Sequence, residues 1–209
     1  MIIQLRDTDV PGTRERIVMA AMELFWEKGY GSTSISDILK KAAANSGSLY
    51  HFFPAKQDVL TAVLDTYYHG IRPMLLDPAW EGVDDAIERI FVLLGRYRQF
   101  LIDTDYFYGC PIGSLALEIH EPDPAVRELL MANFSAWTDA IKECLAAAPG
   151  RLPPDIDRKA LAQFVLTTME GGVMQARTFR SLDPFDASVD QLRNYFDCLG
   201  RTARTSADP

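Results

Sequence analysis

Residues 33–56 constrain the fold of this chain more than any other stretch, because two short helical patterns lie there with only a few residues between them. Ser34 is a favourable helix cap, and Asp37 follows three residues later, as in a capping box. Apolar side chains then recur on one helical face, at Ile35, Ile38, Leu39 and Ala42. The sequence therefore predicts a helix that begins after Ser34 and ends in a turn over residues 43–45.

A second, shorter helix is predicted directly after this turn. Asn45 or Ser46 can cap it, and Pro54 ends it because proline has no amide proton and disfavours the α conformation in the preceding residue. Leu49, Phe52 and Phe53 are predicted to form its buried side. A helix this short is stable only when it packs on neighbouring helices.

The outer face of the second helix carries small and hydroxyl side chains, which suits close approach by another molecule. In a helix-turn-helix, the second helix enters the DNA major groove, where side chains meet base edges and phosphates. We therefore expect DNA contacts from the residues left on this face, which are Ser46, Gly47, Ser48, Tyr50 and His51. Lys56 begins the next helical pattern, where its ammonium and free amides can bind one phosphate together; the alternative is a solvent-facing lysine.

The first 60 or so residues resemble the DNA-binding domain of the TetR family of bacterial transcriptional regulators. The resemblance rests on Leu24-Phe25-Trp26-Glu27-Lys28-Gly29-Tyr30, on Thr33-Ser34, on Gly47-Ser48-Leu49-Tyr50-His51-Phe52-Phe53, and on Lys56. It implies a three-helix DNA-binding domain, and the predicted DNA-binding set also includes Thr33, Ser34 and Asn45. Two positions depart from the family pattern. Ala43 stands where relatives usually have a turn glycine, and Ser46 where many carry a lysine, which leaves base preference open.

Net charge supports a division of the chain. The whole chain has a formal charge of −8, whereas residues 1–60 contain seven basic and seven acidic residues and are neutral. The acidic excess is therefore confined to the part that need not touch DNA. Because a neutral domain has no long-range field of its own, affinity must come from a few placed cations and backbone amides, doubled by dimerisation.

The remainder of the chain shows helical periodicity and no strand-like alternation, so the sequence predicts an all-α protein. We place the DNA-binding domain at residues 1–58 and a larger helical ligand-binding and dimerisation domain at residues 59–209. A helix from Val59 onward is expected to end at Pro73.

The last two long helices, near residues 155–178 and 186–203, are the expected homodimer surface. Gly171 and Gly172 fall inside the first of them, where glycine costs about 1 kcal/mol relative to alanine. Close approach of a partner backbone is one reason to keep them there, and a bound ligand or a kink is another. The family resemblance implies an antiparallel four-helix contact and two DNA-binding domains on a palindromic operator.

Aromatic side chains in the second domain can together line a cavity for a small-molecule effector, although any one of them taken alone is more often a core residue. The predicted ligand-binding set is Phe91, Tyr97, Phe107, Cys110, Ser114, Glu118, Trp137, Phe164 and Gln175. The resemblance implies that a ligand there changes the separation of the DNA-binding domains and releases a repressor from DNA.

Cys110 is a second candidate for effector chemistry. Pro111 favours the first position of a helix, which places Cys110 at the N-terminus, where the helix dipole favours a thiolate. The segment 109–115 also resembles a stretch in which some TetR-like regulators sense electrophiles through a cysteine. The alternative is an inert, buried cysteine.

Other classes of function have little support in the sequence. There is no glycine-rich phosphate loop, no nucleophile elbow and no metal-binding pattern around His51, His69 and His120, so we expect no enzyme activity, metal or cofactor. No apolar run is long enough to cross a membrane, and three widely spaced cysteines suit the reducing cytoplasm. A helical adaptor that does not bind DNA is the alternative, and a helical enzyme is a more remote one.

Overall fold

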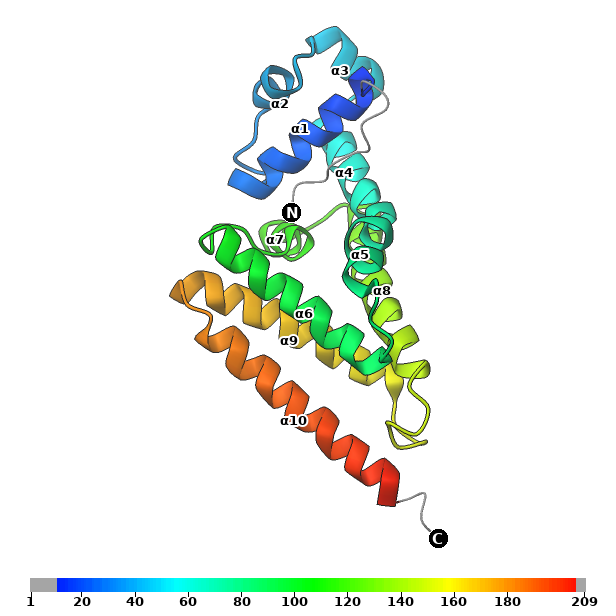
Figure 1. Cartoon of the computed structure of the whole chain (residues 1–209). Helices are drawn as coiled ribbons and strands as arrows, with labels where there is room; N and C mark the ends of the chain where they lie inside the picture. Colours follow the sequence, from blue (N-terminus) through cyan, green and yellow to red (C-terminus); the bar gives the residue numbers. More distant parts are fainter. Residues whose placement is uncertain (1–10, 206–209) are drawn as a thin grey trace. The chain divides into compact units, whose positions relative to one another are not determined.

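The computed structural model describes residues 11–205, and within that range the chain forms ten α-helices, one π-helical segment and no β-strand. The all-α class predicted from the sequence is confirmed. The elements in chain order (Figure 1) are α1 (Thr13–Lys28), α2 (Ile35–Ala42), α3 (Ser46–Phe52), α4 (Lys56–Ile71), η1 (Arg72–Leu76), α5 (Asp77–Trp80), α6 (Ala86–Asp103), α7 (Pro111–Glu118), α8 (Pro124–Ala146), α9 (Arg158–Phe179) and α10 (Asp183–Thr205).

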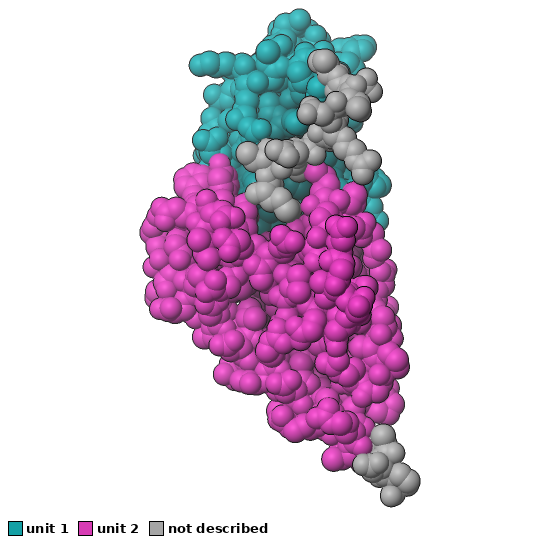
Figure 2. All heavy atoms as spheres, in the orientation of Figure 1, with its two compact units in different colours: residues 1–70, 110–134 teal, residues 71–109, 135–209 magenta. Residues whose placement is uncertain are grey.

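The helices form two compact units, coloured separately in Figure 2. Unit 1 comprises residues 1–70 and 110–134, and unit 2 comprises residues 71–109 and 135–209. This division differs from the sequence-based boundary at residue 58, because most of α4, all of α7 and the start of α8 share one apolar core with α1. The functional assignment of residues 1–58 and 59–209 remains a prediction.

The core of unit 1 holds the three short N-terminal helices in place. Side chains from α1, α2, α3, α4, α7 and α8 meet there, and the fully buried ones include Ile17, Ile38, Leu49, Val63 and Leu64. Asn133 of α8 is a buried polar residue whose amide nitrogen donates to the carbonyl oxygens of Leu64 (3.0 Å) and Leu129 (2.9 Å). The buried amide is therefore hydrogen-bonded, as burial of a polar group requires.

The core of unit 2 is built mainly by α6, α9 and α10. The last two helices run side by side, as Figure 1 shows, and Phe185 and Leu192 of α10 are buried with Val165 and Met169 of α9. Arg98 of α6 makes two hydrogen bonds to the carboxylate of Asp186, at 2.8 and 2.9 Å. Such a paired geometry orients α10 against α6 more strictly than apolar contact alone.

The helix that begins at α4 does not end at Pro73, contrary to the sequence-based expectation. Ile71 and Asp77 both have α-region backbone angles, and the π-helical segment η1 joins α4 to α5 between them. Proline removes one backbone donor and crowds the preceding turn. A wider π turn tolerates that defect, so the helical path continues past the proline.

Candidate nucleic-acid interface

The turn between α2 and α3 is set by short-range hydrogen bonds. The Ser34 hydroxyl accepts from the amide of Asp37 (3.1 Å), and the Asp37 carboxylate accepts from the amide of Ser34 (2.9 Å), so the predicted capping box is confirmed. Asn45 caps α3 by accepting from the amide of Ser48 at 2.8 Å. Ala43 lies between the helices in the left-handed conformation (φ 48°, ψ 48°).

One face of α3 is open to solvent. Ser46, Gly47, Tyr50 and His51 are exposed, with Tyr50 at 54% of its full accessibility, and Ser48 is half-buried. The helix contains no acidic residue. This face can approach a polyanion without charge repulsion, and it offers hydroxyl, phenol and imidazole groups for hydrogen bonds.

The inner face of α3 differs from the prediction at one residue. Leu49 and Phe53 are buried as expected, but Phe52 is 40% exposed. Its ring lies edge-on to His51, with centroids 5.0 Å apart. Phe52 follows Leu49 by three positions, and in so short a helix the unit 1 core covers only the narrow stripe around Leu49.

Thr33 was predicted to contact DNA, and the structure corrects this. Thr33 is 1% exposed, and its hydroxyl donates to the carbonyl oxygen of Gly29 at 2.7 Å. The side chain therefore fastens the end of α1 to the start of α2. Ser34 is exposed, but its hydroxyl is shared between the cap of α2 and the Asp37 carboxylate.

Lys56 is the first residue of α4, as expected, but its ammonium is already engaged. It donates to the carbonyl oxygen of Tyr30 and lies 4.2 Å from the centre of the Tyr30 ring. Partial burial lowers the pKa of Lys56, and the nearby carboxylates of Glu118 and Asp37 oppose that shift. An ammonium has three donors, so one bond to Tyr30 leaves capacity for a phosphate.

Glu118, predicted to bind an effector, instead holds the turn after α1. Its two carboxylate oxygens accept from the amides of Tyr30 (2.8 Å) and Gly31 (2.6 Å). Glu118 is the last residue of α7, so this clamp links α7 to the segment that leads into α2. The sequence could not reveal it, because the partners are 87 and 88 residues apart.

Two arginines of α1 have different surroundings. The guanidinium of Arg16 donates to the carbonyl oxygens of Ala42 (3.2 Å) and Pro11 (3.0 Å), which makes Arg16 a brace between α1 and α2. Arg14 is exposed and lies 5.4 Å from the centre of the Phe53 ring, at the end of α3. Arg14 is thus the α1 cation available for a phosphate beside the open α3 face.

The remaining residues predicted to bind an effector are divided between the two units. Cys110 and Ser114 belong to unit 1, whereas Phe91, Tyr97, Phe107, Trp137, Phe164 and Gln175 belong to unit 2. Within unit 2, Tyr97 and Trp137 are neighbours with ring centroids 5.8 Å apart. Phe107, Phe164 and Gln175 are exposed, and Phe91 packs against Phe196 at 5.5 Å.

The three cysteines differ in exposure. Cys110 is the N-cap residue of α7, as predicted from Pro111, and is only 7% exposed. Burial raises the pKa of the nearby Tyr67 hydroxyl, and Cys110 adds to that shift. Burial also raises the pKa of the Cys144 thiol, whereas Cys198 is exposed. None of the three is in a disulfide.

The outer face of α9 presents a stripe of apolar and small polar residues. It consists of side chains at helical spacing that are exposed or half-buried, namely Phe164, Thr167, Thr168, Gly171, Met174, Gln175 and Thr178. Its three threonine hydroxyls donate to backbone carbonyls of α9 itself, so they need no other partner. Tyr195 of α10 extends this stripe, with its ring edge-on to Phe164 at 5.9 Å.

The two adjacent glycines of α9 have different roles. A Cβ atom on Gly172 would lie 2.9 Å from Cδ2 of Phe185 in α10, so Gly172 serves packing inside the chain. A Cβ atom on Gly171 would meet nothing within 4 Å. The expectation that both glycines serve a partner subunit is therefore corrected for Gly172.

Within residues 11–205, no group of three or more His, Cys, Asp and Glu side chains is arranged to hold a metal ion. No helix in that range is both long and apolar enough to cross a membrane.

Comparison with known proteins gives matches over both units. Residues 17–63 match the family described as bacterial regulatory proteins, tetR family, and residues 86–191 match the C-terminal domain of LmrA/YxaF-like transcriptional regulators. The HTH-type transcriptional regulator Rv0196 of Mycobacterium tuberculosis is 32% identical over 189 residues, which cover 88% of this chain and 93% of the relative.

Solved structures agree with these matches. A TetR transcriptional regulator from Chloroflexus aurantiacus superposes with a TM-score of 0.77 at 29% identity, covering 88% of this chain and 94% of that one. A cysteine mutant of the TetR-family regulator CifR, in complex with a 26-base-pair operator DNA, has the same fold, with a TM-score of 0.71 at 23% identity. That alignment covers 91% of this chain and 98% of CifR.

Proposed function

Because the chain belongs to the TetR family of bacterial transcriptional regulators, we propose that it is a cytoplasmic repressor that binds a palindromic DNA operator as a homodimer. The observation that carries this proposal is the open face of α3, which is free of acidic residues and rests on a buried core. The CifR complex with operator DNA supports the same use of this fold.

On DNA, α3 would enter the major groove. Tyr50 and His51 project from it, Gly47 permits close approach, and Ser46 and Ser48 lie in its first turn. Base preference would come from Ser48 and His51, and position on the duplex from phosphate contacts. Asn45 would act chiefly by capping α3 and so fixing the direction of that helix.

Phosphate contacts are assigned to Lys56 at the start of α4 and to Arg14 of α1. Each is close to an aromatic ring of unit 1, Tyr30 for Lys56 and Phe53 for Arg14, and each keeps unused donors. A few such contacts per subunit, doubled in a dimer, give strongly salt-dependent binding.

The α9 stripe supports a homodimer. Phe164, Met174 and Tyr195 are large apolar side chains exposed on the two helices predicted to meet a second copy. Two-fold symmetry brings the same stripe from both copies together and presents two α3 helices to half-sites about 34–36 Å apart. Gly171 lies in the middle of the stripe and allows the two α9 backbones to approach closely.

Direct binding to DNA tests the proposal. The wild-type chain is titrated against a fragment from upstream of its own gene, by fluorescence anisotropy at several salt concentrations. Tyr50→Ala should weaken binding at least about tenfold, because an interface tyrosine commonly contributes more than 1.4 kcal/mol. Tyr68→Ala, which removes an exposed tyrosine from α4, is the matched control and should bind as the wild type does. Equal binding by the Tyr50 variant contradicts the assignment.

A small-molecule effector would release the DNA by favouring one state of the dimer over the other. Tyr97 and Trp137 support an aromatic effector site in unit 2, because their rings are neighbours. Cys110 is the alternative sensor, at the N-terminus of α7.

The cysteine alternative has its own test. A quinone should release operator DNA from the wild type and from Cys198→Ser, but not from Cys110→Ser. The Cys198 variant is the necessary control, because that thiol is exposed and will react first. Equal release from the Cys110 variant would assign Cys110 to packing and leave a non-covalent effector.

A further inference from the structure

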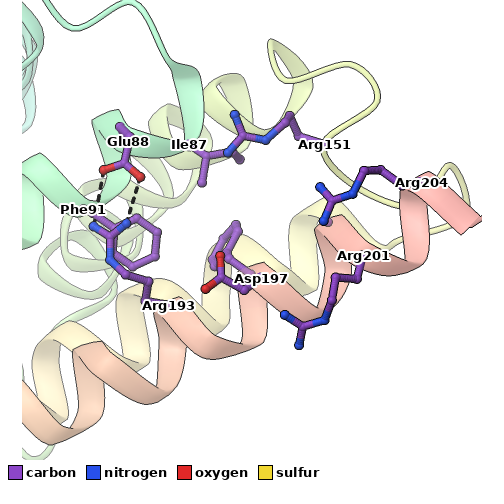
Figure 3. A pocket seen from close by; sticks show the side chains of 10 residues that line it. Ile87, Glu88, Phe91, Arg151, Arg193, Asp197, Arg201 and Arg204 are labelled. Atoms are coloured by element: carbon purple, nitrogen blue, oxygen red, sulfur yellow. Dashed lines mark hydrogen bonds and ion pairs between the residues drawn. The ribbon is translucent and has the colours of Figure 1, made fainter.

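A cleft in unit 2 is lined by an unusual number of arginines (Figure 3). Its walls come from the first turns of α6, from the loop after α8 at Arg151, and from the second half of α10. Four of its lining residues are arginines, in a chain whose net charge is −8. We call it the arginine cleft, and define it by Glu88, Phe91, Arg151, Arg193, Arg201 and Arg204.

Two of the four arginines are already neutralised. Arg193 of α10 makes two hydrogen bonds to the carboxylate of Glu88, at 2.8 and 3.3 Å, and its guanidinium lies 3.8 Å from the centre of the Phe91 ring. Arg151 pairs with Asp85, which also caps α6. These contacts hold the walls of the cleft together and fix the position of its apolar floor.

Arg204 supplies the charge for a ligand, whereas the guanidinium of Arg201 donates to Sγ of Cys198 at 2.9 Å. Among residues 11–205, no carboxylate lies within ion-pair distance of Arg201 or Arg204, and the cleft contains one further acid, Asp197. Figure 3 shows Arg204 extending from α10 and Arg151 extending from the loop toward Ile87. A guanidinium binds carboxylates through two parallel hydrogen bonds, a geometry that a lysine cannot supply.

The floor and the size of the cleft restrict the ligand further. Ile87, Phe91 and Phe196 form an apolar floor beneath the arginines. The cleft volume is about 170 Å³, close to the roughly 150 Å³ of an engineered protein cavity that accepts benzene. We therefore propose that the arginine cleft binds a small organic carboxylate with a single ring or an apolar group of similar size.

This site is independent of the DNA-binding and dimer surfaces proposed above. On α10, Arg193, Asp197 and Arg204 follow at i, i+4 and i+11, which places them on one side of the helix. Tyr195, which extends the α9 stripe, is two residues from Arg193 and therefore about 200° away around the helix. A dimer formed through the stripe leaves the cleft accessible.

The test uses 4-fluorobenzoate as the probe and needs no DNA. Fluorine NMR of the full chain should show saturable binding of 4-fluorobenzoate, and weaker or no binding of 4-fluorobenzyl alcohol, which has the ring but no charge. Arg204→Gln should weaken benzoate binding by roughly tenfold or more, the loss expected for a hydrogen bond to a charged group. Arg96→Gln, which removes an exposed arginine of α6 outside the cleft, is the matched control.

Three results would overturn the proposal. The first is that the wild type shows no saturable binding of 4-fluorobenzoate. The second is that the Arg204→Gln and Arg96→Gln variants bind 4-fluorobenzoate with equal affinity. The third is that millimolar inorganic phosphate binds with the same affinity and displaces 4-fluorobenzoate. The last result would mean that the cleft attracts any anion and does not use its apolar floor. Arg204→Lys, which keeps the charge but not the paired guanidinium donors, provides a second test if Arg204→Gln alters the thermal unfolding of the chain.

Discussion

Replacing Glu118 by glutamine tests whether the clamp between α7 and the turn after α1 holds unit 1 together. The carboxylate accepts two backbone amide hydrogen bonds, from Tyr30 and Gly31. Glutamine has one acceptor oxygen and no charge, so the variant keeps at most one neutral hydrogen bond and exposes the second amide to water. A hydrogen bond to a charged group contributes about 1.5–3 kcal/mol and a neutral one about 1 kcal/mol.

Because Glu118 is solvent-exposed, the lower end of that range applies, and we expect a loss of about 1–2 kcal/mol. For a chain of this length, that loss corresponds to a decrease of roughly 2–8 °C in the midpoint of thermal unfolding. The Lys56 ammonium would also lose the nearby Glu118 carboxylate, which contributes more than Asp37 to raising its pKa.

The measurement is thermal unfolding followed by circular dichroism, with urea unfolding as the second method. Glu121→Gln is the matched control, since Glu121 is exposed and lies only three residues further along the chain. If Glu118→Gln and Glu121→Gln unfold at the same temperature, the clamp contributes nothing to stability and the reasoning fails. A loss confined to the Glu118 variant supports it.

Three more predictions concern local strain, pH and assembly. Ala43→Gly should raise the free energy of unfolding in urea by about 0.5–1 kcal/mol. The reason is that glycine relieves the left-handed backbone strain at position 43, and this gain exceeds the cost of a more flexible unfolded chain. A less stable variant would contradict this. Hydrogen bonds from the Ser34 amide, the larger cause, and from the Lys28 ammonium lower the pKa of Asp37 below its usual value. The ionised Asp37 carboxylate therefore stabilises the folded chain above about pH 4, and this stabilisation is lost as the pH falls further. Asp37→Asn should accordingly be less stable than the wild type at pH 7, and the difference should narrow below pH 4 in urea titrations. Phe164→Glu should weaken dimerisation at least about a hundredfold in analytical ultracentrifugation. Ile102→Glu, at an exposed position of α6, is the control and should leave the dimerisation constant unchanged. A wild-type chain that is monomeric at micromolar concentration would refute the dimer.

The helices around the turn were predictable from the sequence because their caps are local. Ser34 and Asp37 are three residues apart, and so are Asn45 and Ser48, so each cap forms within one helical turn regardless of the rest of the fold. The all-α class followed in the same way from helical spacing of apolar residues. The family resemblance came from residues of this same local region.

Roles that depend on distant partners were not predictable. Thr33 has a hydroxyl suitable for DNA, but only the packing of unit 1 buries it against the end of α1. Glu118 has a carboxylate suitable for a ligand, but the fold places it against amides nearly 90 residues away in the chain. In both cases the residue type allows several partners, and the fold selects one.

Gly171 and Gly172 show the same limit most directly. Both residues lack a side chain, and the sequence alone leaves close approach of a partner, a bound ligand and a kink open for both. Only the packing of α10 against α9 puts Phe185 over Gly172 and leaves open space at Gly171. The arginine cleft also exists only in the folded chain, since α6, the loop at Arg151 and α10 contribute to it from separate parts of the sequence. Local hydrogen bonds and periodicity therefore determine the helices, whereas the surface that each residue faces is decided by which helices pack together.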